Sequence, residues 1–291
     1  MAIPTTPTLD RLCRTALRRA GQPAPSSGMI QEAMNDAFME VKNDIKMKAA
    51  THPLLETEAV LVTVRGVRKL SQPTDAHQVK SVLMFDGPDD WRGTAQTGAS
   101  GSITLASTVS EDEGVLVGKP IFTLSGTGSL QYRHISGYTN STKVATVSPN
   151  WTTTPDSSTT YLVANSQVEL LQTIRQVLNY DQYNFATEGV PCYASLEGEV
   201  MWMDRPPDAI YPTLWTYYMD IDQLDESGTV SQKILREWRS LLTQGITAYS
   251  MDTYDDTRAN DAFTKYHVKL QALAMETLEV QQTRPYDPIV Y

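Results

Sequence analysis

Acidic side chains are the first candidates for chemistry, because a pair of carboxylic acids can hydrolyse a glycosidic bond by acid–base catalysis. They gather in three short clusters, Glu111-Asp-Glu113, Asp220-Ile-Asp222 and Asp252 with Asp255 and Asp256. Each cluster falls in a predicted loop or at a predicted helix start, where a carboxylate caps backbone N–H groups or is solvated. We therefore expect structural acids here and not a hydrolytic pair.

A metal site or an activated nucleophile would need residues at a characteristic spacing. The four histidines, His52, His77, His134 and His267, stand far apart and form no His-x-x-x-His pair. The fragment Gly126-Thr-Gly128 lacks the Gly-Lys-Ser/Thr that continues a phosphate-binding loop, and it indicates a β-turn. The sequence thus predicts no catalytic residues, no metal and no cofactor, and we expect a protein that is not an enzyme.

Aromatic side chains in the C-terminal half could line a ligand cleft or form ordinary core. Their alternation within predicted strands favours a core on one face and an interface on the other. The residues concerned are Trp202, Trp215, Tyr217 and Tyr218.

The charge balance of the 291-residue chain excludes one large class of function. Its formal net charge is −10 and its pI is about 4.9, whereas a protein that grips nucleic acid through phosphates carries a basic footprint. A cluster of arginines at helical spacing indicates a solvated or interface-facing helix side, not a DNA-reading surface. An acidic protein is compatible with a channel that DNA passes through without sticking. The arginines are Arg11, Arg14, Arg18 and Arg19.

Composition is that of a soluble globular chain, with 41% apolar and 20% charged residues. The length indicates roughly one to three domains, and no apolar run approaches the ~18 residues of a membrane span. The N-terminus lacks the pattern of a secretory signal, so we expect folding in a cytoplasm. Cys13 and Cys192 are expected to be buried free thiols, with a disulfide as the open alternative.

Apolar residues at spacings of three and four predict helices near both ends of the chain. The first helix begins after Thr8, a good N-cap, and the last two are expected to pack as an antiparallel hairpin. The predicted helices span 9–20, 29–49, 168–183, 229–249 and 256–280.

Period-two patterns and turn residues predict strands between these helices. Strands at 59–64 and 79–85 are expected to join across the turn Pro73-Thr-Asp75, and further extended segments fall at 192–196, 199–203 and 211–219. Short β-branched runs separated by Gly, Pro, Asn and Asp predict a compact all-β module between Gly93 and Val163.

These elements predict an α+β chain: a helical bundle with an inserted small all-β domain, barrel- or sandwich-like, and an extended C-terminal tail. The expected domains are a helical core with short strands at 1–88 and 166–282, a β domain at 89–165 and a tail at 283–291.

The order of several segments resembles the head-to-tail adaptor (connector) proteins of tailed bacteriophages, particularly short-tailed ones. Residues 57–75 look like the adaptor hairpin before a Pro-x-Asp turn, and residues 125–135 are similar to a Gly-Thr-Gly-x-x-Gln-x-Arg-x-Ile motif of phage structural proteins. Trp151-Thr-Thr-Thr-Pro-Asp156 matches the continuation of that motif, and the turn Met203-Asp-Arg-Pro-Pro-Asp208 resembles the segment before the last helical hairpin.

The resemblance implies a non-enzymatic virion protein at the head–tail junction, made in the cytoplasm of the bacterial host. Such adaptors form a ring, commonly of twelve copies, between the portal and later tail parts, so the implied partners are other copies, the portal protein and tail nozzle or tail fibre proteins. Genomic DNA would pass through the channel without specific binding, and no membrane is implied. A ring of this kind needs contacts between different faces of neighbouring copies.

The C-terminal residues would dock on the portal, with tyrosines as anchors, and packing against the chain's own core is the open alternative. The expected portal-docking residues are Arg284, Pro285, Tyr286, Asp287, Pro288, Ile289, Val290 and Tyr291. The open alternatives are another phage tail component, such as a nozzle or stopper, a peptidoglycan-degrading tail-associated enzyme, and a host-binding module made by the β insertion.

Overall fold

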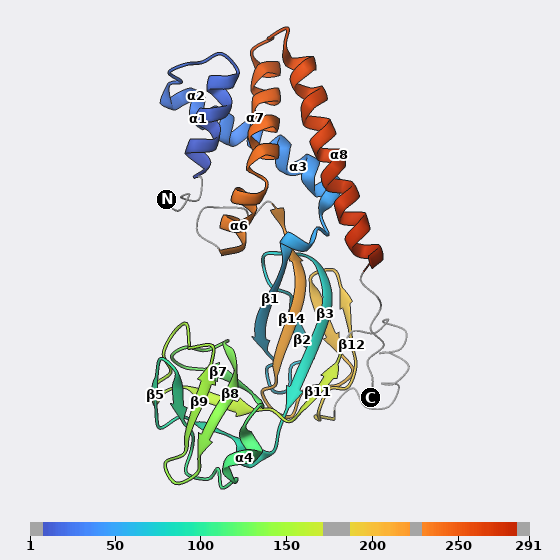
Figure 1. Cartoon of the computed structure of the whole chain (residues 1–291). Coiled ribbons are helices and arrows are strands. Elements are labelled where there is room, and N and C mark those ends of the chain that lie inside the picture. Colours follow the sequence, from blue (N-terminus) through green and yellow to red (C-terminus); the bar gives the residue numbers. More distant parts are fainter. Residues whose placement is uncertain (1–7, 171–186, 222–228, 284–291) are drawn as a thin grey trace. The chain divides into compact units, whose positions relative to one another are not determined.

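The computed structural model describes residues 8–170, 187–221 and 229–283 (Figure 1). The chain forms two compact units. The helical unit comprises Met1–Thr57, Asp75–Gln78 and Tyr217–Tyr291, and the β unit comprises Glu58–Thr74 and Val79–Thr216. The backbone therefore passes from one unit to the other at 57/58, 74/75, 78/79 and 216/217.

Helices make up most of the described part of the helical unit. They are α1 (Leu9–Arg19), α2 (Ser27–Glu32), the π-helical turn η1 (Ala33–Ala37), α3 (Phe38–Ala49), the 3₁₀ turn η2 (Pro53–Leu55), α6 (Thr229–Glu237), α7 (Arg239–Thr253) and α8 (Ala259–Thr283).

Helix α1 shows how the sequence sets these elements. The Thr8 hydroxyl accepts a hydrogen bond from the Arg11 N–H at 3.2 Å, which satisfies one of the free donors at the helix start. Asp10 in the first turn and Arg18 and Arg19 in the last turn complement the helix dipole. The predicted bounds of 9–20 are confirmed to within one residue.

Two predicted helices are interrupted. The helix expected at 29–49 contains the η1 turn, which separates α2 from α3. The helix expected at 229–249 breaks at Trp238, and α7 then continues to Thr253. Trp238 is buried against His52, with their ring centroids 5.2 Å apart, so packing of this large side chain accompanies the break.

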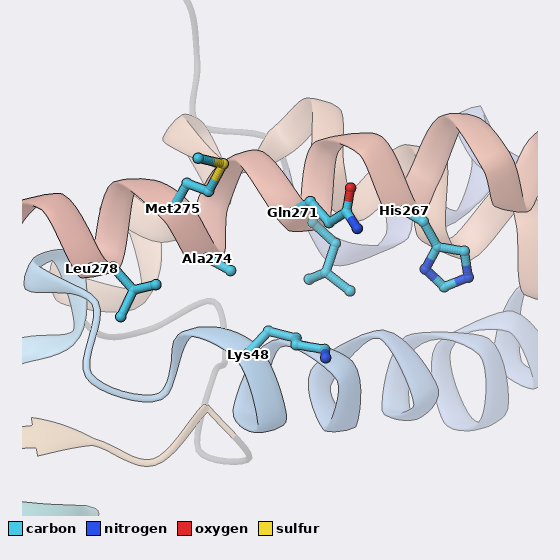
Figure 2. A pocket seen from close by; sticks show the side chains of 7 residues that line it. Lys48, His267, Gln271, Ala274, Met275 and Leu278 are labelled. Atoms are coloured by element: carbon cyan, nitrogen blue, oxygen red, sulfur yellow. The ribbon is translucent and has the colours of Figure 1, made fainter.

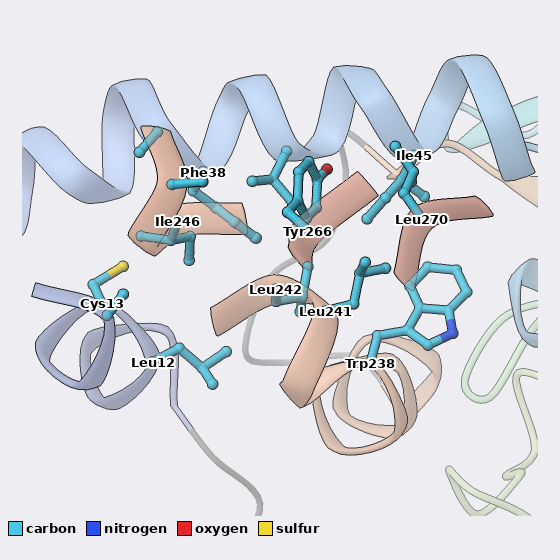
Figure 3. Close-up of a cluster of buried hydrophobic side chains, with 14 of the residues drawn as sticks. Leu12, Cys13, Phe38, Ile45, Trp238, Leu241, Leu242, Ile246, Tyr266 and Leu270 are labelled. Atoms are coloured by element: carbon cyan, nitrogen blue, oxygen red, sulfur yellow. The ribbon is translucent and has the colours of Figure 1, made fainter. Parts of the chain in front are cut away.

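Helix α7 is the centre of the helical core. Figure 3 shows Leu241, Leu242 and Ile246 of α7 between α3, which carries Phe38 and Ile45, and α1, which carries Leu12 and Cys13. Helices α7 and α8 lie side by side as the expected antiparallel hairpin (Figure 1).

Gly245 lets α7 approach its neighbours closely. A Cβ atom at this position would lie 2.5 Å from Val41 Cγ2 of α3 and 2.8 Å from Tyr266 Cε2 of α8, both shorter than a van der Waals contact. Only a residue without a side chain fits between these two buried groups.

The strands form three sheets in the described part of the chain. The four-stranded sheet has the order β1 (Glu56–Val62), β14 (Pro212–Met219), β3 (Ala76–Asp86) and β11 (Ser166–Glu169). The three-stranded sheet has the order β12 (Ala194–Glu197), β13 (Val200–Met203) and β2 (Lys69–Ser71).

The seven-stranded sheet has the order β4 (Arg92–Thr94), β10 (Thr160–Val163), β7 (Pro120–Ser125), β8 (Tyr132–Thr139), β9 (Val144–Ser148), β6 (Ser102–Thr104) and β5 (Thr97–Ala99). The 3₁₀ turn η3 (Asp89–Trp91) leads into it, and the short helix α4 (Glu113–Leu116) lies within its connections. Its strands fall inside the predicted β domain of residues 89–165.

The predicted fold class is wrong. The protein is mixed, with 35% helix and 30% strand, and it is not a helical bundle that carries a small β insertion. The strands outside residues 89–165 build two sheets of their own. The sequence had predicted only short strands within a helical core. The predicted and observed fold classes differ because β1, β2, β3, β13 and β14 pair with strands far away in the sequence.

Strands β1 and β3 do not form the predicted hairpin across Pro73-Thr-Asp75. Strand β14 lies between them, although it is more than 120 residues further along the chain. The expected helix at 168–183 begins instead as strand β11, which pairs with β3, and its remainder from residue 171 lies outside the described residues.

We expect Gly245→Ala to destabilise the helical unit by about 1–3 kcal/mol, because the added methyl group overlaps Val41 and Tyr266. The cost of this overlap should exceed the roughly 1 kcal/mol by which alanine stabilises a helix relative to glycine, so the net effect is a loss of stability. Chemical denaturation measures the change. Gly114→Ala in α4 is the matched control, since its new methyl group meets no atom within 4 Å; equal effects of the two changes would contradict the packing argument.

Candidate interaction surfaces

The carboxylate clusters have structural partners in the described residues. Glu111 accepts a hydrogen bond from Trp91 Nε1 at 3.0 Å. Asp220 forms an ion pair with Lys46 at 2.9 Å, and Asp256 binds the guanidinium of Arg258, which lowers the pKa of that carboxyl to about 2. These acids hold loops and helix ends in place; Asp222 lies outside the described residues.

The histidines are separated in space as well as in sequence. His77 and His134 are exposed on strands, His267 is exposed on α8, and His52 is buried. Within the described ranges, no group of three or more His, Cys, Asp or Glu side chains could hold a metal ion.

Both cysteines are free in the structure, so the disulfide alternative is not supported. Cys13 is buried as expected, and burial raises the pKa of its thiol to about 12. The prediction is wrong for Cys192, which is exposed.

The aromatic cluster of the C-terminal half is divided between core and surface. Trp215 is fully buried and donates to Thr213 Oγ1, and Tyr217 donates to Asp75 at 2.8 Å. Trp202 is 38% exposed with Lys69 Nζ 4.1 Å from its ring centroid.

The Gly-Thr-Gly-x-x-Gln segment is a structural latch in the β unit. Gln131 Nε2 donates to the carbonyl oxygens of Gly128 and Thr153, at 2.7 and 2.9 Å. Its Oε1 accepts from the N–H groups of Thr152 and Thr153, at 2.8 and 3.1 Å. One side chain thus fastens the loop after β7 to the segment after β9. Gly126, at φ +80°, makes the turn that the sequence predicted.

An apolar groove opens between α3 and α8 and has a volume of about 610 Å³. Figure 2 shows Gln271, Ala274 and Leu278 of α8 opposite Lys48 of α3. Two of its apolar side chains are largely open to solvent, Met275 at 63% and Leu278 at 57%. Contiguous exposed apolar surface of this kind is typical of an interaction site.

Two further exposed methionines stand on α3, outside the groove. Met47 is 73% exposed and Met39 is 41% exposed, and both lie on the side of α3 that faces away from the core. The sequence alone did not predict this surface. Its signal was present as apolar residues outside the core stripe of each helix, but the groove itself depends on how α3 and α8 pack.

The arginine cluster of α1 is exposed, as the helical spacing predicts, and Arg14 forms an ion pair with Asp10 at 2.8 Å. Arg19 also lines a hollow of about 290 Å³ together with Arg236 and Arg239. The predicted portal-docking residues, 284–291, lie outside the described residues.

Within the part of the chain that the structure describes, every helix is too short or too polar to span a lipid bilayer. Comparison with known protein families finds none that matches the chain, and comparison with curated proteins finds no match.

His52 should make the stability of the helical unit depend on pH. Burial lowers the pKa of His52, and Glu276, whose Oε1 lies 3.8 Å from Nε2, opposes this only in part. The unfolded chain therefore binds a proton near pH 6.5 that the folded chain binds only at lower pH, so stability decreases as pH falls from about 6.5 to the folded pKa.

We expect His52→Asn to flatten this decrease, which can reach about 1.4 kcal/mol per pH unit for one proton. Asparagine keeps an acceptor for the Leu54 N–H, which His52 Nδ1 now binds at 3.1 Å. Glu276→Gln should extend the decrease to lower pH, because it removes the charge that favours protonated His52. Urea denaturation at several pH values measures both variants, and identical pH profiles in wild type and His52→Asn would contradict the assignment.

Gln131→Glu should destabilise the β unit by about 1–3 kcal/mol, because a carboxylate oxygen would replace the donor that faces the carbonyls of Gly128 and Thr153. Acidification below about pH 4 should restore part of the loss, since a protonated carboxyl can donate again. Thermal unfolding and hydrogen exchange of residues 126–131 and 150–155 measure the effect. The exposed Gln167→Glu is the control; a similar loss there would exclude the latch.

Proposed function

We propose that this chain is a structural, non-enzymatic subunit of a tailed-phage virion: an adaptor that forms an oligomeric ring between the portal and the tail. The location would be the head–tail junction. The proposal rests on the order of segments along the chain, which resembles head-to-tail adaptors, and on one structural observation, the apolar groove between α3 and α8, which no described residue covers.

The groove supports assembly because its apolar side chains have no cover within the described part of the chain. A second copy of the chain is the proposed occupant. A surface that receives a different surface of the next copy produces a ring when the rotation between copies closes. Burying Met47, Met275 and Leu278, which are each more than half exposed, would contribute apolar contact area to each such joint.

The resembling motif supports a structural role for the β unit as well. Gln131 and Arg133, two of its residues, are committed to holding the 150–153 segment: Arg133 Nε donates to the Asn150 carbonyl at 2.9 Å, and its guanidinium lies over the Trp151 ring. These side chains hold the two loops together. A stiff β unit suits contact with tail components.

In this proposal the ring commonly holds twelve copies, the portal receives residues 284–291, and nozzle or fibre proteins attach on the tail side. Genomic DNA would pass through the ring without specific binding, which the net charge of −10 favours because like charges repel.

Electron microscopy of the full chain mixed with portal protein tests the proposal. We expect a ring that caps the portal, and a variant without residues 284–291 should cap it at least about tenfold less while its circular dichroism stays unchanged. A chain that leaves portal rings bare while it binds isolated tail tubes would instead indicate a nozzle or stopper. Peptidoglycan cleared by the purified chain would contradict the non-enzymatic role.

A further inference from the structure

The α3 side of the helical unit carries unpaired negative charge next to its exposed methionines. Asp36 and Glu40 are exposed one turn apart, at the start of this side, and Asp252 lies in the last turn of α7. Asp252 and Glu40 both act on Tyr249, whose pKa is raised mainly by burial, so these carboxylates converge on one region. None of the three has an ion-pair partner in the described residues.

The opposite side of the core, the arginine side, carries unpaired positive charge. Arg11, Arg18 and Arg19 of α1 and Arg239 of α7 are exposed, and their side chains have no ion-pair partner within the described ranges. Arg19 and Arg239 line the same hollow of about 290 Å³. In Figure 3, α3 runs along one edge of the core cluster, whereas Leu12 of α1 and Trp238 lie along the other.

Arg239 and Asp252, at the two ends of α7, are too far apart to neutralise each other within one subunit. Arg239 is the first residue of α7 and Asp252 its last but one, which places them about 20 Å apart along the helix axis. The Debye length is only about 8 Å at physiological salt. The positive Arg239 stands at the N-terminus of α7 and the negative Asp252 near its C-terminus. The helix dipole disfavours each charge at its position, so neither stabilises α7.

We propose that the arginine side of one copy docks on the α3 side of the next copy, head to tail. This inference rests on the proposed ring and adds a second contact between copies to that of the groove between α3 and α8. Arg19 and Arg239 would pair with Asp36 and Glu40, and the aliphatic stems of the arginines would cover Met39 and Met47. Because the two sides differ, copies add in one direction only.

Charge reversal and its complement test the contact in the full chain. Arg19→Glu with Arg239→Glu makes both sides acidic, and Asp36→Lys with Glu40→Lys makes both sides basic. Each double variant alone should lose self-association, with the apparent Kd raised at least about tenfold at low salt. An equal mixture should associate again, because each acidic side then finds a basic one.

Analytical ultracentrifugation and native mass spectrometry measure the assemblies. Arg19→Lys with Arg239→Lys is the matched control: it keeps the charge and should still assemble. The loss in the charge-reversed variants should shrink as salt rises from about 0.05 to 0.5 M, where screening weakens wild-type contacts too.

The outcomes separate this contact from the proposed function. If wild type assembles and both charge-reversed variants assemble equally well, the contact is wrong while the ring stands. If wild type forms open chains of no fixed size that the variants abolish and the mixture restores, the contact stands and the closed ring is wrong. Wild type and mixture that both remain monomeric at high concentration, without and with portal protein, overturn both.

Discussion

The close approach of α7 to α3 and α8 at Gly245 is the constraint on which the helical unit depends. Val41 and Tyr266 occupy the space where a side chain would stand, so the three helices pack backbone against side chain at this crossing. This contact fixes the distance between α3 and α8 near their crossing with α7. Further along, near Lys48 and Leu278, the apolar groove lies between the two helices. Tight packing at one point and an open surface at another therefore belong to the same helix arrangement.

Local signals in the sequence were enough for elements that depend on local physics. Thr8 predicts the start of α1, and alternating residues predict β13 and β14 close to their observed bounds. Pairing between distant segments was not predictable in this way. Nothing near Val60 or Val82 indicates that β14 will lie between their strands, because the partners meet only in the folded chain. The fold class was wrong for this reason.

The candidate surfaces also differ in whether local sequence predicts them. The exposed arginines of α1 follow from helical spacing alone, whereas their counterpart on α3 requires knowledge of which side of that helix is buried. The groove needs two helices that are more than 200 residues apart in sequence. Gln131 belongs to the motif that resembles phage structural proteins, but its four hydrogen bonds to Gly128, Thr152 and Thr153 depend on the folded loops.

The fourfold passage of the backbone between the two units has a mechanical and an evolutionary consequence. A pull on one unit is shared by several covalent connections, at 57/58, 74/75, 78/79 and 216/217, and not borne by a single tether. Exchange of the β unit for another by recombination would have to preserve every one of these junctions at once. The two units should therefore be inherited together, and sequence variation should concentrate in loops far from the junctions.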